Sequence, residues 1–511
     1  MDTGFLKSFL PEIYFSMAIF FQLIFNSRFI NKVSFNFPIV YKENFYQTLV
    51  MFVCLILLYF NLKIEGFFSN FLFVNDEGAV FLKVIVVFFT GLALFFINLS
   101  FSLQFINFFE YFSIFLLSFL GLLLLINVSD IISAYLIIEM QALCFYILAS
   151  FKRNSSFSTE AGLKYFVSGS FISGIFLLGA SVVYGCLGTL NFNLLSWLLS
   201  FDFDIEFSFL KLAIMTGILL ITFALFFKVS AVPFHFWAPD VYEGAPLAST
   251  IVFSIIPKVS LFVFLIRWVL AISVFFSDIR ALFLIVGILS VVLGTFFAIR
   301  QKRVKRLLIY SSIAQVGFLI VSFHSLNIEG FSSLVFFLII YLITSILVWG
   351  NLVLFYNSAG NAGLKYISTF FISGLTGLAK VNPLAALSFV IIFFSISGIP
   401  PLSGFLAKIF IFFNLLNFES FGSAILLILF NMVSVYYYIR IIKVIFFEVK
   451  GIDRNNIKFQ MTYQVCQHEL IFLLVVSLLL LLVFIFVYPS FFLMVAQYIV
   501  LSLENNYFVI S

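Results

Sequence analysis

Charged residues are scarce in this chain. Asp, Glu, Lys and Arg make up only 10% of its 511 residues, whereas 64% are hydrophobic and the mean hydropathy is +1.22. Soluble globular domains carry about 25% charged residues, so this composition excludes a soluble domain of this size. The sequence predicts an integral membrane protein.

Cysteine and histidine are also rare, with four and three residues respectively. The cysteines are Cys54, Cys144, Cys186 and Cys466, and none forms a CxxC pair. Cys466 and His468 lie close together but supply only two ligands, which do not make a metal site. The sequence contains no Gly-rich phosphate loop, haem-binding pattern, or flavin or nicotinamide fingerprint. We therefore expect this chain to bind no metal and no redox cofactor.

Apolar stretches of about twenty residues recur along the whole chain. A helix needs about that length to cross roughly 30 Å of hydrocarbon, whereas a barrel strand needs only about ten residues. We therefore expect an all-α polytopic membrane protein with about fourteen transmembrane helices, at residues 9–27, 44–62, 79–99, 106–127, 130–151, 161–188, 208–238, 247–271, 279–299, 304–324, 331–356, 384–416, 421–447 and 469–491.

The seventh and twelfth of these stretches are too long for one straight helix and contain Pro233 in one, Pro400 and Pro401 in the other. Proline removes a backbone donor and clashes with the preceding turn, which predicts broken helices. Breaks five helices apart favour two inverted repeats, helices 4–8 in residues 106–271 and helices 9–13 in residues 279–447. Helices 1–3 then occupy residues 1–105, and helix 14 with a tail occupies residues 448–511. The alternative is that proline only kinks these helices for packing.

Basic residues predict the orientation. Loops that leave odd-numbered helices hold seventeen Lys and Arg, against four in the other loops, namely Lys63, Lys211, Arg267 and Arg280. Basic loops remain on the side of synthesis, so both termini are expected on the opposite, intermembrane-space side. The net charge of +5 needs no nucleic-acid partner. The 79 Phe and the absence of an Arg- and Ser-rich presequence favour an organellar gene.

We expect five ionisable residues to lie at membrane depth in the central region: Glu139, Lys164, Lys228, Lys258 and Lys408. An ionised side chain at the bilayer centre costs roughly 2.5–3.5 kcal/mol on insertion scales, so such residues seldom persist without a function. Each can gain and lose a proton, and we expect them to form a relay in which Lys228 pairs with Glu139. The alternative is a set of packing ion pairs and of lysines that reach the membrane interface.

Polar residues near these lysines are candidates for bridging them. His235 follows the break at Pro233, and we include it in the candidate relay. Ser311, Ser312 and Gln315 lie in the tenth predicted helix. Such side chains can hold water, or can simply join membrane helices through hydrogen bonds.

Several segments together resemble the antiporter-like membrane subunits of respiratory complex I, NADH:ubiquinone oxidoreductase. They are IIEMQALCFYILASFKRN with STEAGLKYFVSGS, FKVSAVPFHFWAPDVYEGAP, KRLLIYSSIAQVGFL and SISGIPPLSGFLAK. The resemblance spans residues 110–450. The pairing of EMQALCFYILASFKRN with STEAGLKYF favours the subunit-2 family within this superfamily. It implies fourteen core helices, inverted repeats with broken seventh and twelfth helices, and proton translocation driven by quinone reduction elsewhere in the complex.

The resemblance also implies roles for single residues. By motif, Glu139 matches the fifth-helix glutamate, Lys228 its seventh-helix partner, Lys258 the eighth-helix relay lysine, Lys408 the twelfth-helix terminal lysine, and Lys164 a supporting lysine. Related chains often have histidine where Gln315 stands. Water bound to an amide must replace an imidazole at that point.

Three functions compete for this sequence. The first is a proton-translocating subunit of complex I in the mitochondrial inner membrane, beside antiporter-like subunit 4, the small membrane subunits and lipid. FMN, iron–sulfur clusters and ubiquinone are then bound by other subunits, and this chain carries no redox centre of the enzyme. The second is an Mrp-type sodium/proton antiporter subunit, and the third is a noncatalytic membrane scaffold.

Overall fold

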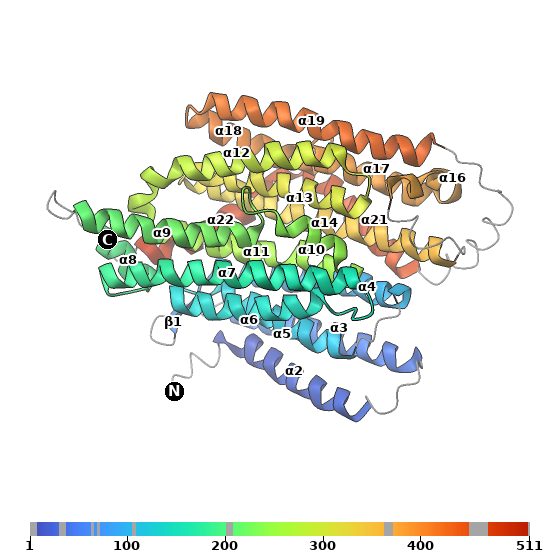
Figure 1. The fold of residues 1–511 in the computed structure, drawn as a ribbon, viewed down its shortest axis with the longest axis horizontal. Helices are drawn as coiled ribbons and strands as arrows, with labels where there is room; N and C mark the ends of the chain where they lie inside the picture. The colour runs from blue at the N-terminus through green and yellow to red at the C-terminus, as the bar shows by residue number, and fades with distance from the viewer. Residues whose placement is uncertain are drawn as a thin grey trace.

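The computed structural model describes residues 8–29, 37–62, 66–68, 72–104, 109–200, 208–361, 371–448 and 469–508. Within these ranges most of the chain is helical, and the helices lie side by side along the longest axis of the molecule (Figure 1). A small antiparallel hairpin joins β1 (Gly66–Phe68) to β2 (Phe73–Asn75). The predicted all-α membrane architecture is confirmed.

Three N-terminal helices form one side of the bundle: α2 (Leu10–Phe29), α3 (Phe37–Asn61) and α4 (Glu77–Gln104). Helix α3 packs against α2 and α4, and α4 reaches the centre of the bundle, where it contacts α11 and α14. A buried ion pair between Lys83 and Glu12 joins α4 to α2. A buried ion pair needs its partner to offset the desolvation of each charge.

The next helices correspond to predicted helices 4–8. They are α5 (Phe109–Ile126), α6 (Ile131–Ala149), α7 (Ser156–Leu187), α9 (Ser208–Val229), α10 (Trp237–Gly244) and α11 (Leu247–Ala271), with the short α8 (Phe192–Leu199) between α7 and α9. Asp130 caps α6, because its carboxylate accepts hydrogen bonds from the backbone N–H groups of Ile132 and Ser133. Helix α11 is buried along its whole length and forms the centre of the bundle.

The C-terminal helices correspond to predicted helices 9–14. They are α12 (Phe276–Arg300), α13 (Val304–Val321), α14 (Ile328–Asn361), α16 (Leu378–Val381), α17 (Pro383–Ser397), α18 (Ser403–Asn417), α19 (Phe421–Phe446), α21 (Glu469–Val487) and α22 (Pro489–Phe508). The chain bends by 88° between α21 and α22, and α22 returns to pack on α4 and α14. Where the sequence suggested a tail, the described residues form a packed helix.

Both proline-containing stretches are interrupted, as predicted. Helix α9 ends at Val229 and α10 begins at Trp237, while α17 ends at Ser397 and α18 begins at Ser403. At the first break a side chain replaces a lost helical hydrogen bond: Trp237 Nε1 donates to the carbonyl of Phe227 at 3.0 Å. After α17, Gly398 adopts the left-handed conformation (φ 78°) that glycine accepts without strain.

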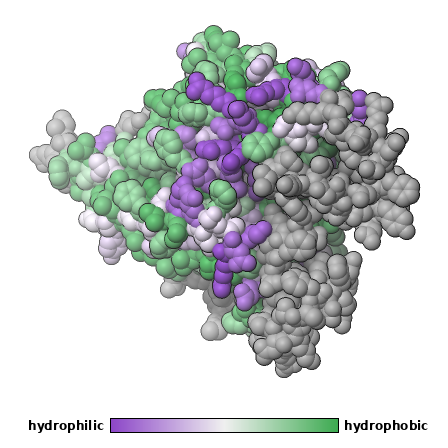
Figure 2. Space-filling view, turned by 45° about the vertical axis from the view of Figure 1, so that its right-hand side comes forward, coloured by the Kyte–Doolittle hydropathy of each residue, from purple (hydrophilic) through white to green (hydrophobic). Residues whose placement is uncertain are grey.

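Nine helices of the described residues are long and apolar enough to cross a membrane, or ten with the bent α21–α22 pair. Helices α2, α3, α5, α17 and α18 are shorter apolar helices, so the count of about fourteen spans stays a prediction. Hydrophilic residues form a band across the end of the molecule that faces the viewer in Figure 2, beside hydrophobic flanks. This distribution fits a helical bundle whose flanks contact lipid and whose end in this view contacts water.

The structure corrects the loop assignment of three basic residues. Lys211 lies in α9 and Arg280 in α12. Arg267 lies inside α11 with a fully buried side chain, and its Nη2 lies 2.5 Å from Asp76 Oδ2. Hydropathy cannot show that the partner charge of Arg267 lies 191 positions earlier in the chain.

Candidate functional site

Lys228 and Glu139 face each other across two helices. Lys228 lies in the last turn of α9, directly before the break, and Glu139 lies in the middle of α6. The Nζ atom of Lys228 is 3.9 Å from Oε1 of Glu139, and the side chains are 11% and 23% exposed. The structure thus places together the two residues that the sequence suggested as a pair.

A cavity of about 30 Å³ lies between Lys228 and Lys258. Its lining includes Gln141, Tyr165 and Tyr242 besides the two lysines. A site of roughly 10–15 Å³ holds one water when polar partners surround it. The cavity therefore has the size and the polar lining for about two water molecules between the lysines.

Lys258 is held in the centre of the bundle by tyrosine. It is 3% exposed, and its Nζ donates to the hydroxyl of Tyr341 on α14 at 2.7 Å, while that hydroxyl donates to the carbonyl of Ser254 at 2.8 Å. The preceding residue, Pro257, lies inside α11 and provides no N–H to the carbonyl four residues earlier. That carbonyl, on Phe253, accepts instead from the hydroxyl of Tyr242 at 3.1 Å.

Lys408 lies at the second break. It is 4% exposed, and although it belongs to α18 its Nζ donates to the carbonyls of Ile396 and Ser397 at the end of α17, at 2.8 and 3.0 Å. A third bond, of 2.6 Å, reaches Oδ1 of Asn431 on α19. Carbonyls at a helix C-terminus lack intrahelical donors and carry partial negative charge, so they favour a cation.

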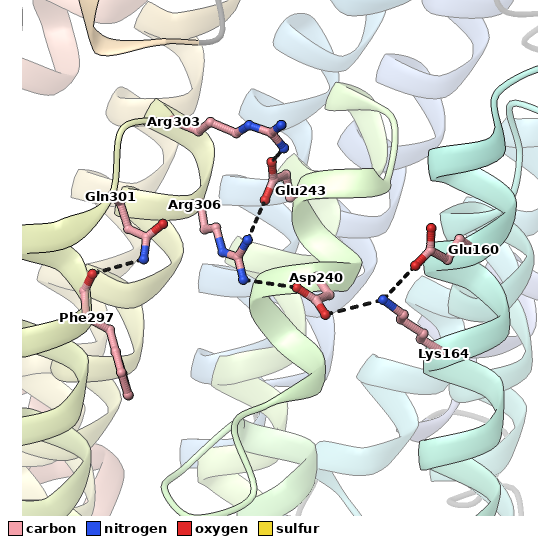
Figure 3. A network of polar contacts seen from close by, with 8 residues as sticks. All are labelled: Glu160, Lys164, Asp240, Glu243, Phe297, Gln301, Arg303 and Arg306. Atoms are coloured by element: carbon pink, nitrogen blue, oxygen red, sulfur yellow. Dashed lines mark hydrogen bonds and ion pairs between the residues drawn. The ribbon is translucent and has the colours of Figure 1, made fainter.

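Lys164 does not lie with the buried lysines. Its side chain is 48% exposed and pairs with Glu160 at 2.7 Å and with Asp240 at 3.4 Å. Figure 3 shows that these residues belong to a chain of charges from α7 across α10 to α13: Glu160, Lys164, Asp240, Glu243, Arg303 and Arg306. Exposed ion pairs contribute about 0–1 kcal/mol each, so this network orients three helix ends more than it stabilises them.

His235 is also apart from the lysines. Its ring is buried against the rings of Phe236 and Phe297, at centroid distances of 4.4 and 6.2 Å, and it does not line the cavity. The hydroxyls of Ser311 and Ser312 donate to carbonyls of their own helix, at 2.7 and 2.8 Å. Ser311 also hydrogen-bonds the Tyr438 side chain on α19, and His235 contacts Phe297 on α12, so both join helices, which is one of the two roles that the sequence allows.

Several residues of the site were not predicted. Tyr242 and Asp240 stand in the quoted PDVYEGAP motif, but the sequence shows no reason for their contacts. Tyr341 and Asn431 lie within apolar runs, and no local pattern distinguishes them from packing residues. No group of three potential metal ligands occurs among the described residues, and Cys466 and His468 lie outside them.

Comparison with known proteins decides the family. Residues 128–435 match the model for the transmembrane region of NADH:quinone oxidoreductase and Mrp antiporter subunits. The chain belongs to this family. It is 35% identical over 484 residues to NADH-ubiquinone oxidoreductase chain 2 of Marchantia polymorpha, which covers 94% of this chain and 95% of that protein.

Solved structures of this family share the fold. Respiratory complex I of Thermus thermophilus contains a chain that aligns with a TM-score of 0.73 at 22% identity, over 95% of this chain and 99% of the other. The Mrp complex of Dietzia sp. contains one with a TM-score of 0.78 at 17% identity, over 99% and 98%. At such identities the likeness concerns the fold alone.

Proposed function

We propose that this chain is a proton-translocating membrane subunit of a NADH:quinone oxidoreductase, and that protons pass along Glu139, Lys228, Lys258 and Lys408. The relatives named as NADH-ubiquinone oxidoreductase chain 2 support the complex. They also support placing the chain in the mitochondrial inner membrane, beside other membrane subunits of that complex. Electrons then move through cofactors of other subunits.

The cavity between Lys228 and Lys258 is the observation that carries the relay. Proton transfer between side chains on separate helices needs hydrogen-bonded steps, which bridging water supplies. On the other side of Lys228, Oε1 of Glu139 lies 3.9 Å from Lys228 Nζ and extends the relay toward α6. Beyond Lys258, the hydroxyl of Tyr341 extends the hydrogen-bonded groups to α14. Lys408 lies at the second break, with its Nζ 5.2 Å from the centroid of the Phe318 ring on α13.

The two inverted repeats form part of the proposal. In each unit the third helix contacts both halves of the broken helix: α7 contacts α9 and α10, and α14 contacts α17 and α18. In each unit a lysine ammonium lies beside the end of the first half-helix, Lys228 from within α9 and Lys408 from α18. The equivalent placement supports a common task for the two breaks.

The test replaces Lys258 with Met, which keeps the length of the side chain and removes its exchangeable proton. We expect NADH-driven proton uptake into membrane vesicles to fall to background, while reduction of an artificial acceptor by NADH continues. Lys305→Met is the matched control, because Lys305 is equally buried in α13 but donates to the carbonyl of Ala245. Wild-type proton uptake in fully assembled Lys258→Met would refute the relay.

A second candidate function is an Mrp-type antiporter subunit, because the matching family model covers both NADH:quinone oxidoreductase and Mrp antiporter subunits. The two functions differ in what drives transport. A subunit of the oxidoreductase translocates protons on addition of NADH without sodium. An antiporter subunit requires a sodium gradient and does not respond to NADH.

A further inference from the structure

A basic pocket lies apart from the proposed relay, between the connection from α12 to α13, helix α19 and residues 371–373. Its volume is about 570 Å³, within the range of roughly 300–1,000 Å³ of small-molecule sites. Lys302, Arg440 and Lys443 line it together with one carboxylate, Glu448. Three cations against one anion leave an excess of two positive charges, so the pocket suits an anionic group.

Two of the cations are available to a ligand. Among the described residues, no hydrogen bond or ion pair engages the ammonium groups of Lys302 and Lys443, both of which are exposed. Arg440 donates one N–H to the carbonyl of Ile299, at 3.2 Å. A guanidinium has five N–H donors, so four remain for a ligand. The pocket can therefore offer several charge-assisted hydrogen bonds to phosphate oxygens.

An apolar stripe leads into this pocket. Helix α19 packs on α12, α17 and α18, and its other face exposes Ile425, Ile428, Leu429, Met432, Tyr436 and Ile439. The last two residues also line the pocket, so the stripe and the pocket are continuous. From Ile425 to Tyr436 the helix rises about 17 Å at ~1.5 Å per residue, similar to half of the roughly 30 Å hydrocarbon layer.

We propose that this pocket and stripe bind an anionic phospholipid. The phosphate headgroup contacts Lys302, Arg440 and Lys443, and an acyl chain lies along α19. Basic pockets between membrane helices bind anionic headgroups in this way. A free phosphate would use the pocket but not the stripe, and a protein partner would cover the stripe without needing the excess charge.

The experiment uses the whole respiratory complex in phosphatidylcholine bilayers that contain a trace of phosphatidylglycerol with a photoreactive acyl chain. We expect labelling within residues 425–439 to be several-fold stronger than with the same probe on phosphatidylcholine. The double variant Lys302→Gln with Lys443→Gln should lower it to the phosphatidylcholine level. The charge-retaining variant Lys302→Arg with Lys443→Arg should keep it.

The matched control, Lys152→Gln with Arg153→Gln, removes two exposed charges from the loop between α6 and α7 and should leave labelling unchanged. Equal labelling by both lipids, or full labelling in the double Gln variant, would overturn the proposal. Loss of labelling with millimolar inorganic phosphate would assign the pocket to a free anion. Cross-links from α19 to another subunit in place of lipid would assign the stripe to a protein partner.

Discussion

The hydroxyl of Tyr341 offers a sharp test of the relay because a single atom can be removed. In Tyr341→Phe the ring remains, and with it the contact of the Lys258 ammonium 4.7 Å from the ring centroid. The 2.7 Å bond from Lys258 and the 2.8 Å bond to Ser254 are lost. Since a helical carbonyl keeps its bond from the N–H four residues later, the fold should change little.

The expected effect follows from the strength of that bond. Hydrogen bonds to charged groups contribute about 1.5–3 kcal/mol. The hydroxyl is expected to hold the Lys258 ammonium in the position from which it transfers its proton. Losing the whole free energy of this hydrogen bond then lowers the rate of proton transfer roughly 10- to 150-fold, at about 1.36 kcal/mol per factor of ten. We therefore expect Tyr341→Phe to reduce proton translocation by at least about tenfold.

The assay is NADH-driven proton uptake into vesicles, measured with a pH-sensitive dye and divided by the amount of assembled complex. Tyr46→Phe is the matched control, since the Tyr46 hydroxyl donates to the carbonyl of Ala18 at 2.8 Å and lies in the N-terminal helices. That variant should translocate protons normally. If Tyr341→Phe also stays within twofold of the wild type while Lys258→Met is inactive, Lys258 transfers protons without help from this hydroxyl.

Three further predictions concern the charged residues. Lys408→Arg keeps the charge but cannot release a proton, so a relay should lose translocation in both Lys408→Arg and Lys408→Ala, whereas a scaffold should tolerate arginine in the same vesicle assay. Lys228→Ala should abolish translocation but leave NADH-dependent reduction of an artificial acceptor intact; normal pumping at full assembly would exclude Lys228 from the relay. Asp76→Asn removes the carboxylate facing buried Arg267 and should destabilise the chain by about 3–5 kcal/mol. The loss of stability is measured as a lower Tm of the purified complex. The control is Lys164→Gln in the exposed network, which should cost less than about 1 kcal/mol. Equal Tm values for the two variants would contradict the prediction.

The scaffold alternative and the relay differ in their dependence on exchangeable protons. The contacts of Lys408 with two carbonyls and Asn431 would hold α17, α18 and α19 together in either case. An arginine can replace those contacts but not the proton release. For this reason the paired variants at Lys408 distinguish the two functions better than any single alanine substitution.

Several features of this protein could be predicted from local sequence. Long apolar runs predict membrane helices because hydrocarbon admits only backbone that satisfies its own hydrogen bonds. Pro233, Pro400 and Pro401 predict the two breaks because proline has no N–H. Lys228 and Lys408 are conspicuous because each charge interrupts an apolar run. All three signals are confined to a single helix, so no knowledge of its neighbours is required.

The contacts that build the site depend on which helix faces meet. Tyr341 reaches Lys258 across 83 positions of the chain, and Arg267 reaches Asp76 across 191. Hydropathy cannot show such pairs, because a helix such as α11 is buried on every face and its pattern does not indicate which face meets which neighbour. It also could not show that Lys164 and His235 lie apart from the buried lysines.

By itself, then, the sequence determined the membrane class, the two interrupted helices and the ionisable residues placed in them. Only the tertiary structure decided that Lys228 and Lys258 share a cavity with room for water, and that Lys408 reaches back to the end of α17. The physical reason is that desolvation acts on each charge separately and is visible in the surrounding run of residues. The cost of desolvation is offset by partner groups on other helices, and the packing of the whole bundle decides which groups these are.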